Sequence, residues 1–223
     1  MRREIVAEGI GTALLLYVIV GSGIAAQRLG DDAAVQLLAH AVAVGLGLAV
    51  LIALLQTVSG SHFNPAVTLA FWRSGAIDGR FAIGYGSAQL VGAVAGVAAA
   101  NYSFGEGMLQ ASTTDRVGTG LILAELISTF VLVLVILALV RTDRAEAVPL
   151  AVGAWVAAIV FATSSTGFAN PAVTVSRVFT DTYTGIGAAS VPGFVLAQLA
   201  AGLLSVPVAR FLFPENARRP SLN

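Results

Sequence analysis

Six segments of the sequence are long and apolar enough to cross a lipid bilayer, which restricts the chain to a membrane fold. A spanning helix needs about 20 mostly apolar residues to cross a hydrocarbon core of roughly 30 Å. Charged residues make up only 11% of the 223 positions, far below the share of about 25% found in soluble domains. We therefore predict an all-α membrane protein whose spans lie at about 5–26, 35–58, 81–100, 118–140, 148–163 and 191–213, the fifth being short.

The sequence is an internal duplication. Three short motifs occur in the first half and return in the same order in the second half. Because each half holds three spans, an odd number, the second half must enter the membrane from the opposite side, which makes the repeats inverted. We predict one domain over 1–223, made of the repeats 1–112 and 113–223. The recurring motifs are Ala-Glu at 7–8 and 124–125, Asn-Pro-Ala-Val-Thr at 64–68 and 170–174, and Ala-Gln-Leu at 88–90 and 197–199.

Each copy of the pentapeptide predicts the start of a short helix. Asparagine is a favoured N-cap and proline is favoured at the first helical position. The apolar run after Pro65 ends at Trp72, and the run after Pro171 ends at Val175 or Phe179. At 1.5 Å per residue, eight or nine residues extend about 12 to 14 Å, roughly half of the bilayer. We predict two re-entrant half-helices in addition to the six spans.

Two half-helices in a bilayer imply a water-filled path. Irregular backbone at membrane depth is tolerated only where it is buried in protein or lines a cavity. Inverted repeats bring the half-helices together with their N-termini facing each other, so both positive dipole ends repel cations at the bilayer centre. The amide NH2 groups of the two asparagines can point into the lumen and interrupt a proton relay. The predicted pore centre consists of Asn64, Pro65, Ala66, Asn170, Pro171 and Ala172.

A single Asn-Pro-Ala triplet is no more than a helix start. Two copies, at matching places of an inverted repeat, resemble the aquaporin and aquaglyceroporin family, also called the major intrinsic proteins. The resemblance runs from the Ala-Glu pair at 7–8 to the Ala-Gln-Leu tripeptide at 197–199. It implies six tilted helices and two half-helices around one pore per subunit, homotetrameric assembly in the bilayer, and passive conduction of small neutral solutes.

The resemblance also implies a constriction, a selectivity filter of four positions on the external side. Strict water channels of the family typically have an aromatic residue, a histidine and an arginine in this filter. Here the residues are small and apolar, which favours water together with glycerol-like polyols, urea-like molecules or neutral metalloid hydroxides such as arsenous acid. A water-selective channel is the alternative. Spacing from the triplets gives Val44, Gly167, Val173 and, on the fifth span, either Ala158 or the favoured Val160.

Two acidic residues, Glu8 and Glu125, lie deep in the predicted spans. An intramembrane acid is a functional candidate, and a proton-coupled secondary transporter would use such a pair. The alternative is that each glutamate accepts hydrogen bonds from loop backbone and supports its own half-helix. The family resemblance favours the supporting role.

Four further polar residues lie near the predicted pore. His40 faces either the lumen or a neighbouring helix. His62 is expected to hold the loop before the first triplet, with gating as the alternative. Arg177 could stand in for the missing filter arginine, although a surface ion pair with Asp181 is the favoured interpretation.

The arginines predict the orientation in the cell membrane. All 12 basic residues are arginines, and such residues concentrate on the cytoplasmic side. Cytoplasmic termini leave only Arg28, Arg116 and Arg177 outside, with the loop 101–117 also external. The nine arginines expected inside are Arg2, Arg3, Arg73, Arg80, Arg141, Arg144, Arg210, Arg218 and Arg219.

The sequence gives no indication of an enzyme. No Ser/His pair, HExxH motif or paired aspartates occur within the spans, so we expect neither a catalytic site, nor a metal site, nor a cofactor. The 12 acidic and 12 basic residues balance, and nothing suggests a nucleic-acid partner. There is no cysteine, which excludes disulfides and thiolate chemistry.

Overall fold

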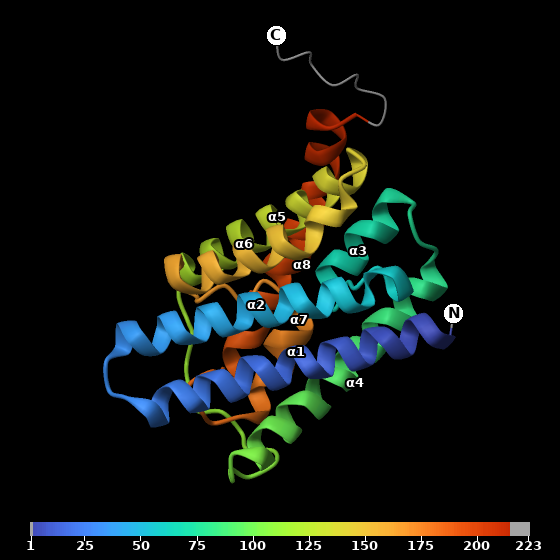
Figure 1. Ribbon diagram of the computed structural model, residues 1–223. Coiled ribbons are helices and arrows are strands. Elements are labelled where there is room, and N and C mark those ends of the chain that lie inside the picture. Colours follow the sequence, from blue (N-terminus) through green and yellow to red (C-terminus); the bar gives the residue numbers. More distant parts are fainter. Residues whose placement is uncertain (1, 215–223) are drawn as a thin grey trace.

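The structure, a computed structural model, describes residues 2–214, which form helices and no strand (Figure 1). Six helices are long and apolar enough to span a bilayer, which confirms the predicted fold class. Their ends lie within three residues of the expected ones. The spans are α1 (Arg2–Leu29), α2 (Ala33–Ser59), α4 (Gly79–Ser103), α5 (Thr119–Arg141), α6 (Val148–Ala162) and α8 (Val191–Leu212).

Two short helices begin at the repeated triplets. Helix α3 (Pro65–Ser74) has ten residues, and α7 (Pro171–Ser176) has six and continues into the 3-10 turn Arg177–Phe179. Each has proline at its start and asparagine as N-cap, as the sequence predicts. Two further 3-10 turns, Ala145–Ala147 and Ala188–Ser190, lead into α6 and α8 and lengthen these two spans.

Equivalent helices of the two halves run in opposite directions. Helix α1 leaves the end of the molecule that carries the N-terminus, whereas α5 starts at the opposite end (Figure 1). We call that opposite end the distal end; it contains residues 28–32, 104–118 and 180–187. The Arg28–Glu106 ion pair and hydrogen bonds such as Gly187 N to Thr114 O join these segments. Arg218 and Arg219, which bear on the predicted orientation, lie outside the described residues.

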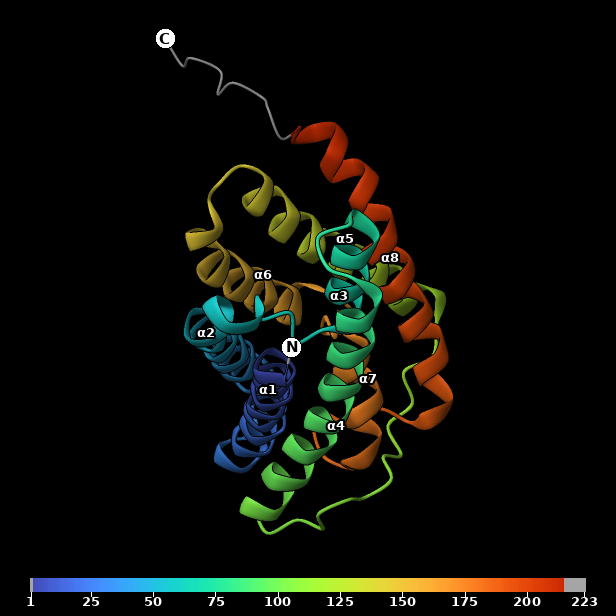
Figure 2. The ribbon, with the colours of Figure 1, turned by 90° about the vertical axis from the view of Figure 1, so that its right-hand side faces the viewer.

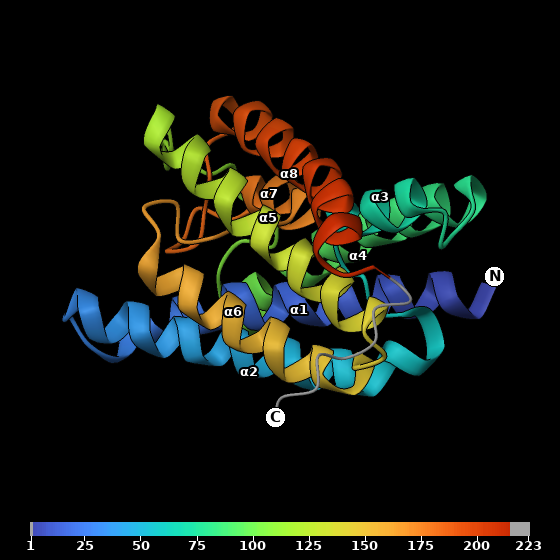
Figure 3. The same ribbon diagram turned by 90° about the horizontal axis from the view of Figure 1, so that it is seen from above.

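Small residues allow the helices to approach closely. A Cβ atom at Gly92 in α4 would lie 2.1 Å from the carbonyl oxygen of Gly9 in α1, and one at Gly45 in α2 would lie 2.6 Å from the oxygen of Gly153 in α6. Such contacts suit lipid, where packing rather than hydrophobicity drives helix association. Helix α5 packs against α8 and α2 against α6 (Figure 3).

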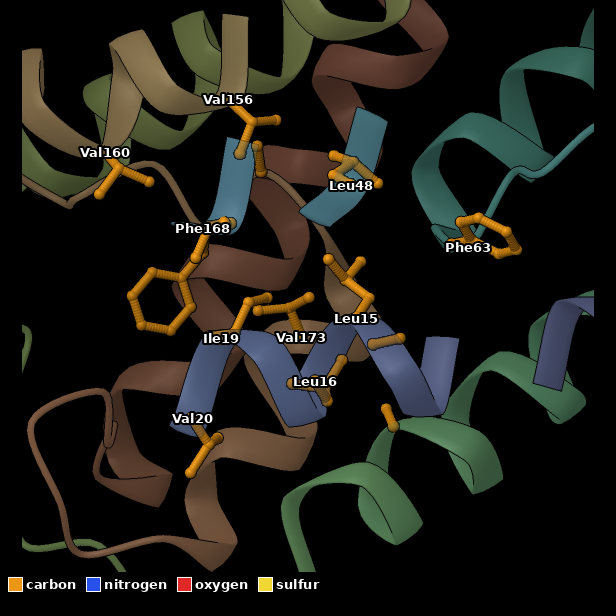
Figure 4. Packing of buried hydrophobic residues seen from close by; sticks show 14 of the residues in the cluster. Leu15, Leu16, Ile19, Val20, Leu48, Phe63, Val156, Val160, Phe168 and Val173 are labelled. Carbon is orange, nitrogen blue, oxygen red and sulfur yellow. The ribbon is translucent and has the colours of Figure 1, made fainter. Parts of the chain in front are cut away.

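The six spans surround the two half-helices, as the view from the end with the N-terminus shows (Figure 2). The loops before the triplets therefore lie inside the bundle, where Phe63 and Phe168 are buried. Apolar side chains from both halves meet around them (Figure 4). On α1, Leu15 and Ile19 point toward this meeting place, whereas Leu16 and Val20 point away from it.

Candidate functional site

A cavity runs through the middle of the bundle and is lined by both halves of the chain. It leaves about 70 Å³ for the centres of water-sized molecules, enough for several waters at roughly 10 to 15 Å³ each. Two helices contribute a residue at every fourth position, which places one side of each helix along the cavity. These stripes are His40, Val44, Leu48 and Ile52 on α2, and Val148, Val152, Val156 and Val160 on α6.

The two triplets meet at the middle of this cavity. Asn64 Oδ1 accepts a hydrogen bond from Ala66 N at 2.9 Å, and Asn170 Oδ1 accepts one from Ala172 N at 2.9 Å. Both asparagine side chains line the cavity. Each oxygen is thus occupied by its own half-helix, and the NH2 group is the part of the side chain left for other partners.

The asparagines also join the two halves reciprocally. Asn64 Nδ2 donates to the carbonyl oxygen of Ala169, and Asn170 Nδ2 donates to that of Phe63, both at 2.8 Å. Each NH2 group has a second hydrogen, for which no acceptor exists among residues 2–214. Because the side chains line the cavity, this second hydrogen is available to a solute.

The residue before each triplet has a strained backbone. Phe63 and Ala169 have φ angles of 47° and 46°, in the left-handed region that non-glycine residues rarely adopt. Their carbonyl oxygens accept the bonds from the opposite asparagine, and their N–H groups donate to Glu8 Oε2 and Glu125 Oε2 at 2.7 and 2.8 Å. The same two residues therefore connect the buried glutamates to the centre of the cavity.

Glu8 is completely buried and accepts four hydrogen bonds from the first half. Besides Phe63 N, the donors are Ser59 Oγ at 2.6 Å, His62 N at 2.9 Å and Gln89 Nε2 at 2.8 Å. Glu8 does not line the cavity. Its carboxyl group is thus engaged with the loop rather than available to a solute.

Glu125 repeats this arrangement in the second half. It is completely buried, does not line the cavity, and accepts from Ser165 Oγ at 2.6 Å, Phe168 N at 2.9 Å and Gln198 Nε2 at 2.6 Å, as well as from Ala169 N. Repeated sequence motifs include one donor to each of the two glutamates. Gln89 and Gln198 belong to the repeated Ala-Gln-Leu tripeptide, but the sequence did not reveal what they bind.

The four residues assigned to the constriction all line the cavity: Val44, Val160, Gly167 and Val173. Ala158 is exposed on the outer face of α6, so of the two candidates on α6 it is Val160 that reaches the cavity. Gly167 has a φ of 55°, and a Cβ there would lie 2.5 Å from Ile159 Cγ1. A side chain at this position would therefore meet Ile159 as well as adopt an unfavourable backbone conformation.

His62 and His40 both line the cavity and both have a structural bond. His62 Nδ1 lies 3.1 Å from Thr68 Oγ1, a contact between the loop and α3. His40 Nδ1 lies 2.8 Å from Ser22 Oγ of α1. His40 therefore both faces the cavity and bonds to a neighbouring helix, so the two predicted alternatives for this side chain occur together.

The expected surface ion pair between Arg177 and Asp181 is wrong. The α-helix ends at Ser176 and the chain becomes extended at Thr180, so the two side chains do not share a helix face. Asp181 instead accepts bonds from Thr113 N and Oγ1 at 2.9 and 3.0 Å. Arg177 is buried, lines the cavity, and its guanidinium lies 3.6 Å from the centre of the Phe168 ring.

Opposed half-helices, a central cavity lined by both repeats and two buried glutamates bonded to the loops before the half-helices define a membrane channel. Comparison with known proteins agrees with this class. The family model described as "Major intrinsic protein" matches residues 1–201. The chain belongs to the major intrinsic protein family, whose members are channels for small neutral solutes and not enzymes.

Relatives resemble the chain over most of its length. The aquaglyceroporin AqpS of Rhizobium meliloti (strain 1021) is 43% identical over 212 residues, which cover 95% of this chain and 91% of the relative. Aquaporin TIP2-1 of Arabidopsis thaliana is 36% identical over 184 residues, covering 76% and 72% of the two chains. The X-ray structure of the aquaglyceroporin from Plasmodium falciparum has the same fold, with a TM-score of 0.76, 23% identity and 96% coverage of both chains.

Proposed function

We propose that the protein is a passive channel for water and for small uncharged solutes, including glycerol-like polyols and neutral metalloid hydroxides such as arsenous acid, and that it excludes ions and protons. The observation that carries this proposal is the set of small, apolar residues at the assigned constriction: Val44, Val160, Gly167 and Val173. Such residues leave space beside a polyol carbon chain and offer few hydrogen bonds to replace an ion's water shell. An ion would therefore be desolvated without compensation.

The pore centre supports the exclusion of ions and protons. The N-termini of α3 and α7 face the cavity and direct positive potential toward it. The remaining amide hydrogens of Asn64 and Asn170 can hold the oxygen of a passing water, which must then orient its own hydrogens away from the centre. The name of the relative AqpS, an aquaglyceroporin, agrees with a solute range that extends beyond water.

Two alternatives have less support. A strictly water-selective channel would require polar groups that hold water at the constriction, and the four assigned residues supply no polar side chain. A proton-coupled transporter would require Glu8 and Glu125 to exchange protons with the lumen. Both carboxylates instead have four donors each and are shielded from the cavity.

Flux measurements on reconstituted protein test the proposal. Proteoliposomes should shrink and reswell rapidly in gradients of glycerol, urea and arsenite, and should also conduct water. A channel gives fluxes that rise linearly with the gradient and do not respond to pH or sodium. Uptake that saturates and depends on a proton or sodium gradient would instead identify a transporter, and water flux without glycerol or arsenite flux would identify the water-selective alternative.

Mercurial compounds are expected to leave conduction unchanged, because the sequence contains no cysteine for them to modify. Water flux is measured with and without mercuric chloride. The variant Val44→Cys places a thiol on the cavity wall and should become sensitive to the reagent. If the Val44→Cys variant conducts normally in the presence of mercury, Val44 does not line the conducting path.

The proposed setting is the cell membrane, with both termini in the cytoplasm and four copies assembled as a homotetramer. The arginine distribution supports the orientation, since among the described residues Arg28, Arg116 and Arg177 contact the distal residues Glu106, Gly185 and Thr184. In this orientation the distal end is external. Apolar side chains on the outer faces of α1 and α2, such as Ile10 and Leu46, are exposed and available for lipid or for neighbouring copies.

A further inference from the structure

A buried arginine lines the cavity beyond the apolar constriction. Arg177 follows Val173 by four residues, about one helical turn toward the distal end. Its Nε donates to the carbonyl oxygen of Thr184, and the face of the Phe168 ring supports its guanidinium at 3.6 Å. Within the described residues, no carboxylate pairs with this cation and no hydrogen bond engages its two terminal nitrogens, which leaves these donors to the lumen.

A histidine of α2 also lines the cavity on the distal side of the constriction. His40 precedes Val44 by four residues, and because α2 begins at the distal end, this also places His40 about one turn beyond the constriction. Ser22 Oγ engages Nδ1, and Tyr183 packs against the ring edge-on at 5.8 Å. In the part of the chain that the structure describes, Nε2 has no partner, so this nitrogen can form one hydrogen bond with a solute.

We propose that Arg177 and His40 form a second, polar filter in series with the apolar constriction and on its distal side. A solute hydroxyl or a water accepts from Arg177 and bonds to His40 Nε2 there before it enters the apolar ring. The fixed positive charge repels cations at the same point, and no carboxylate among the described residues forms an ion pair with it. This inference rests on the proposed neutral-solute channel and names the residues that select within it.

The charge of Arg177 is tested by two substitutions. Arg177→Gln removes the charge, and we expect cation leak through reconstituted channels, measured with a potential-sensitive dye in a potassium gradient, to rise at least about tenfold. Arg177→Lys keeps the charge and should retain cation exclusion. The matched control is Arg116→Gln, because the Arg116 guanidinium lies 5.1 Å from the same Phe168 ring but does not line the cavity.

His40→Leu tests the second member of the filter. The variant removes one hydrogen-bonding group from the lumen and puts an apolar side chain in its place, so glycerol flux is expected to fall about fivefold relative to water flux. Size-exclusion profiles of the purified variants establish that each one folds.

The outcomes separate the two proposals. If folded Arg177→Gln excludes potassium as well as the parent channel does, or if Arg116→Gln leaks to the same extent, the second filter is refuted while glycerol conduction by the parent still stands. An unchanged ratio of glycerol to water flux in His40→Leu removes His40 from the filter. If the parent channel itself conducts no glycerol, arsenite or urea, the broader function fails whatever the variants do.

Discussion

Replacing Glu8 by leucine is expected to abolish conduction and to lower the thermal stability of the channel sharply. The substitution leaves four buried donors, from Ser59, His62, Phe63 and Gln89, without their acceptor. Each buried donor left unsatisfied costs about 1 to 3 kcal/mol, so the total loss is at least about 4 kcal/mol. The strained backbone at Phe63 would also lose the bond that holds it. Thermal unfolding in detergent and water flux in proteoliposomes measure the two effects.

The inverted repeat supplies a second version of this experiment. Glu125→Leu removes the acceptor of Ser165, Phe168, Ala169 and Gln198, and a loss of similar size is expected. Glu106→Gln is the control, because Glu106 forms an exposed ion pair with Arg28, and such pairs contribute about 0 to 1 kcal/mol. Parent-like unfolding and flux in either leucine variant would rule out the supporting role.

Val173→Arg is expected to reduce glycerol and arsenite permeability at least about tenfold while water continues to pass. The new side chain enters the cavity at the assigned constriction, where a long guanidinium group narrows the lumen and adds donors that hold water. It also places a second cation one turn from Arg177. Swelling of proteoliposomes, measured for water, glycerol and arsenite, shows how the substitution changes the range of solutes that the channel conducts.

A companion variant separates size from charge at this position. Val173→Met also introduces an unbranched side chain longer than valine, but methionine is shorter than arginine and uncharged, so it should slow glycerol less and should leave cation exclusion unchanged. Equal losses of glycerol flux in the two variants would assign the effect to volume alone. Unchanged glycerol and arsenite flux through Val173→Arg would mean that the constriction lies elsewhere.

The elements of the fold could be predicted from the sequence because each carries a local signal. Spans are set by apolar length, and the half-helices by Asn-Pro pairs that cap and start a helix. The fifth span looked short because α6 has only 15 residues. The 3-10 segment Ala145–Ala147 precedes it directly and lengthens the span. Counting positions could not choose between Ala158 and Val160, since that choice depends on the rotation of α6 about its axis.

The filter region could be predicted only in part. The positions of its polar residues depend on where helix α7 ends and the chain leaves the helical conformation. Asp181 lies four residues after Arg177, a spacing that would pair them on a continuous helix. Helix α7 stops at Ser176, however, and the following residues turn toward the distal loops, which carries Asp181 to Thr113. No local pattern in the sequence marks this stop. The regular valines of α6, by contrast, form a stripe at every fourth residue that could have been recognised as the cavity wall.

The reciprocal bonds between the asparagines and the opposite loops bear on how such a protein is made and how it arose. The acceptor of Asn64 lies 105 residues further along the chain, and the acceptor of Asn170 lies 107 residues back. During synthesis, the side-chain amide of Asn64 therefore has no acceptor until most of the second half has been inserted into the membrane. The hydrogen bonds at the pore centre form late in folding. An ancestral single repeat, before the gene duplicated, would have needed a second copy inserted upside down to complete the same centre.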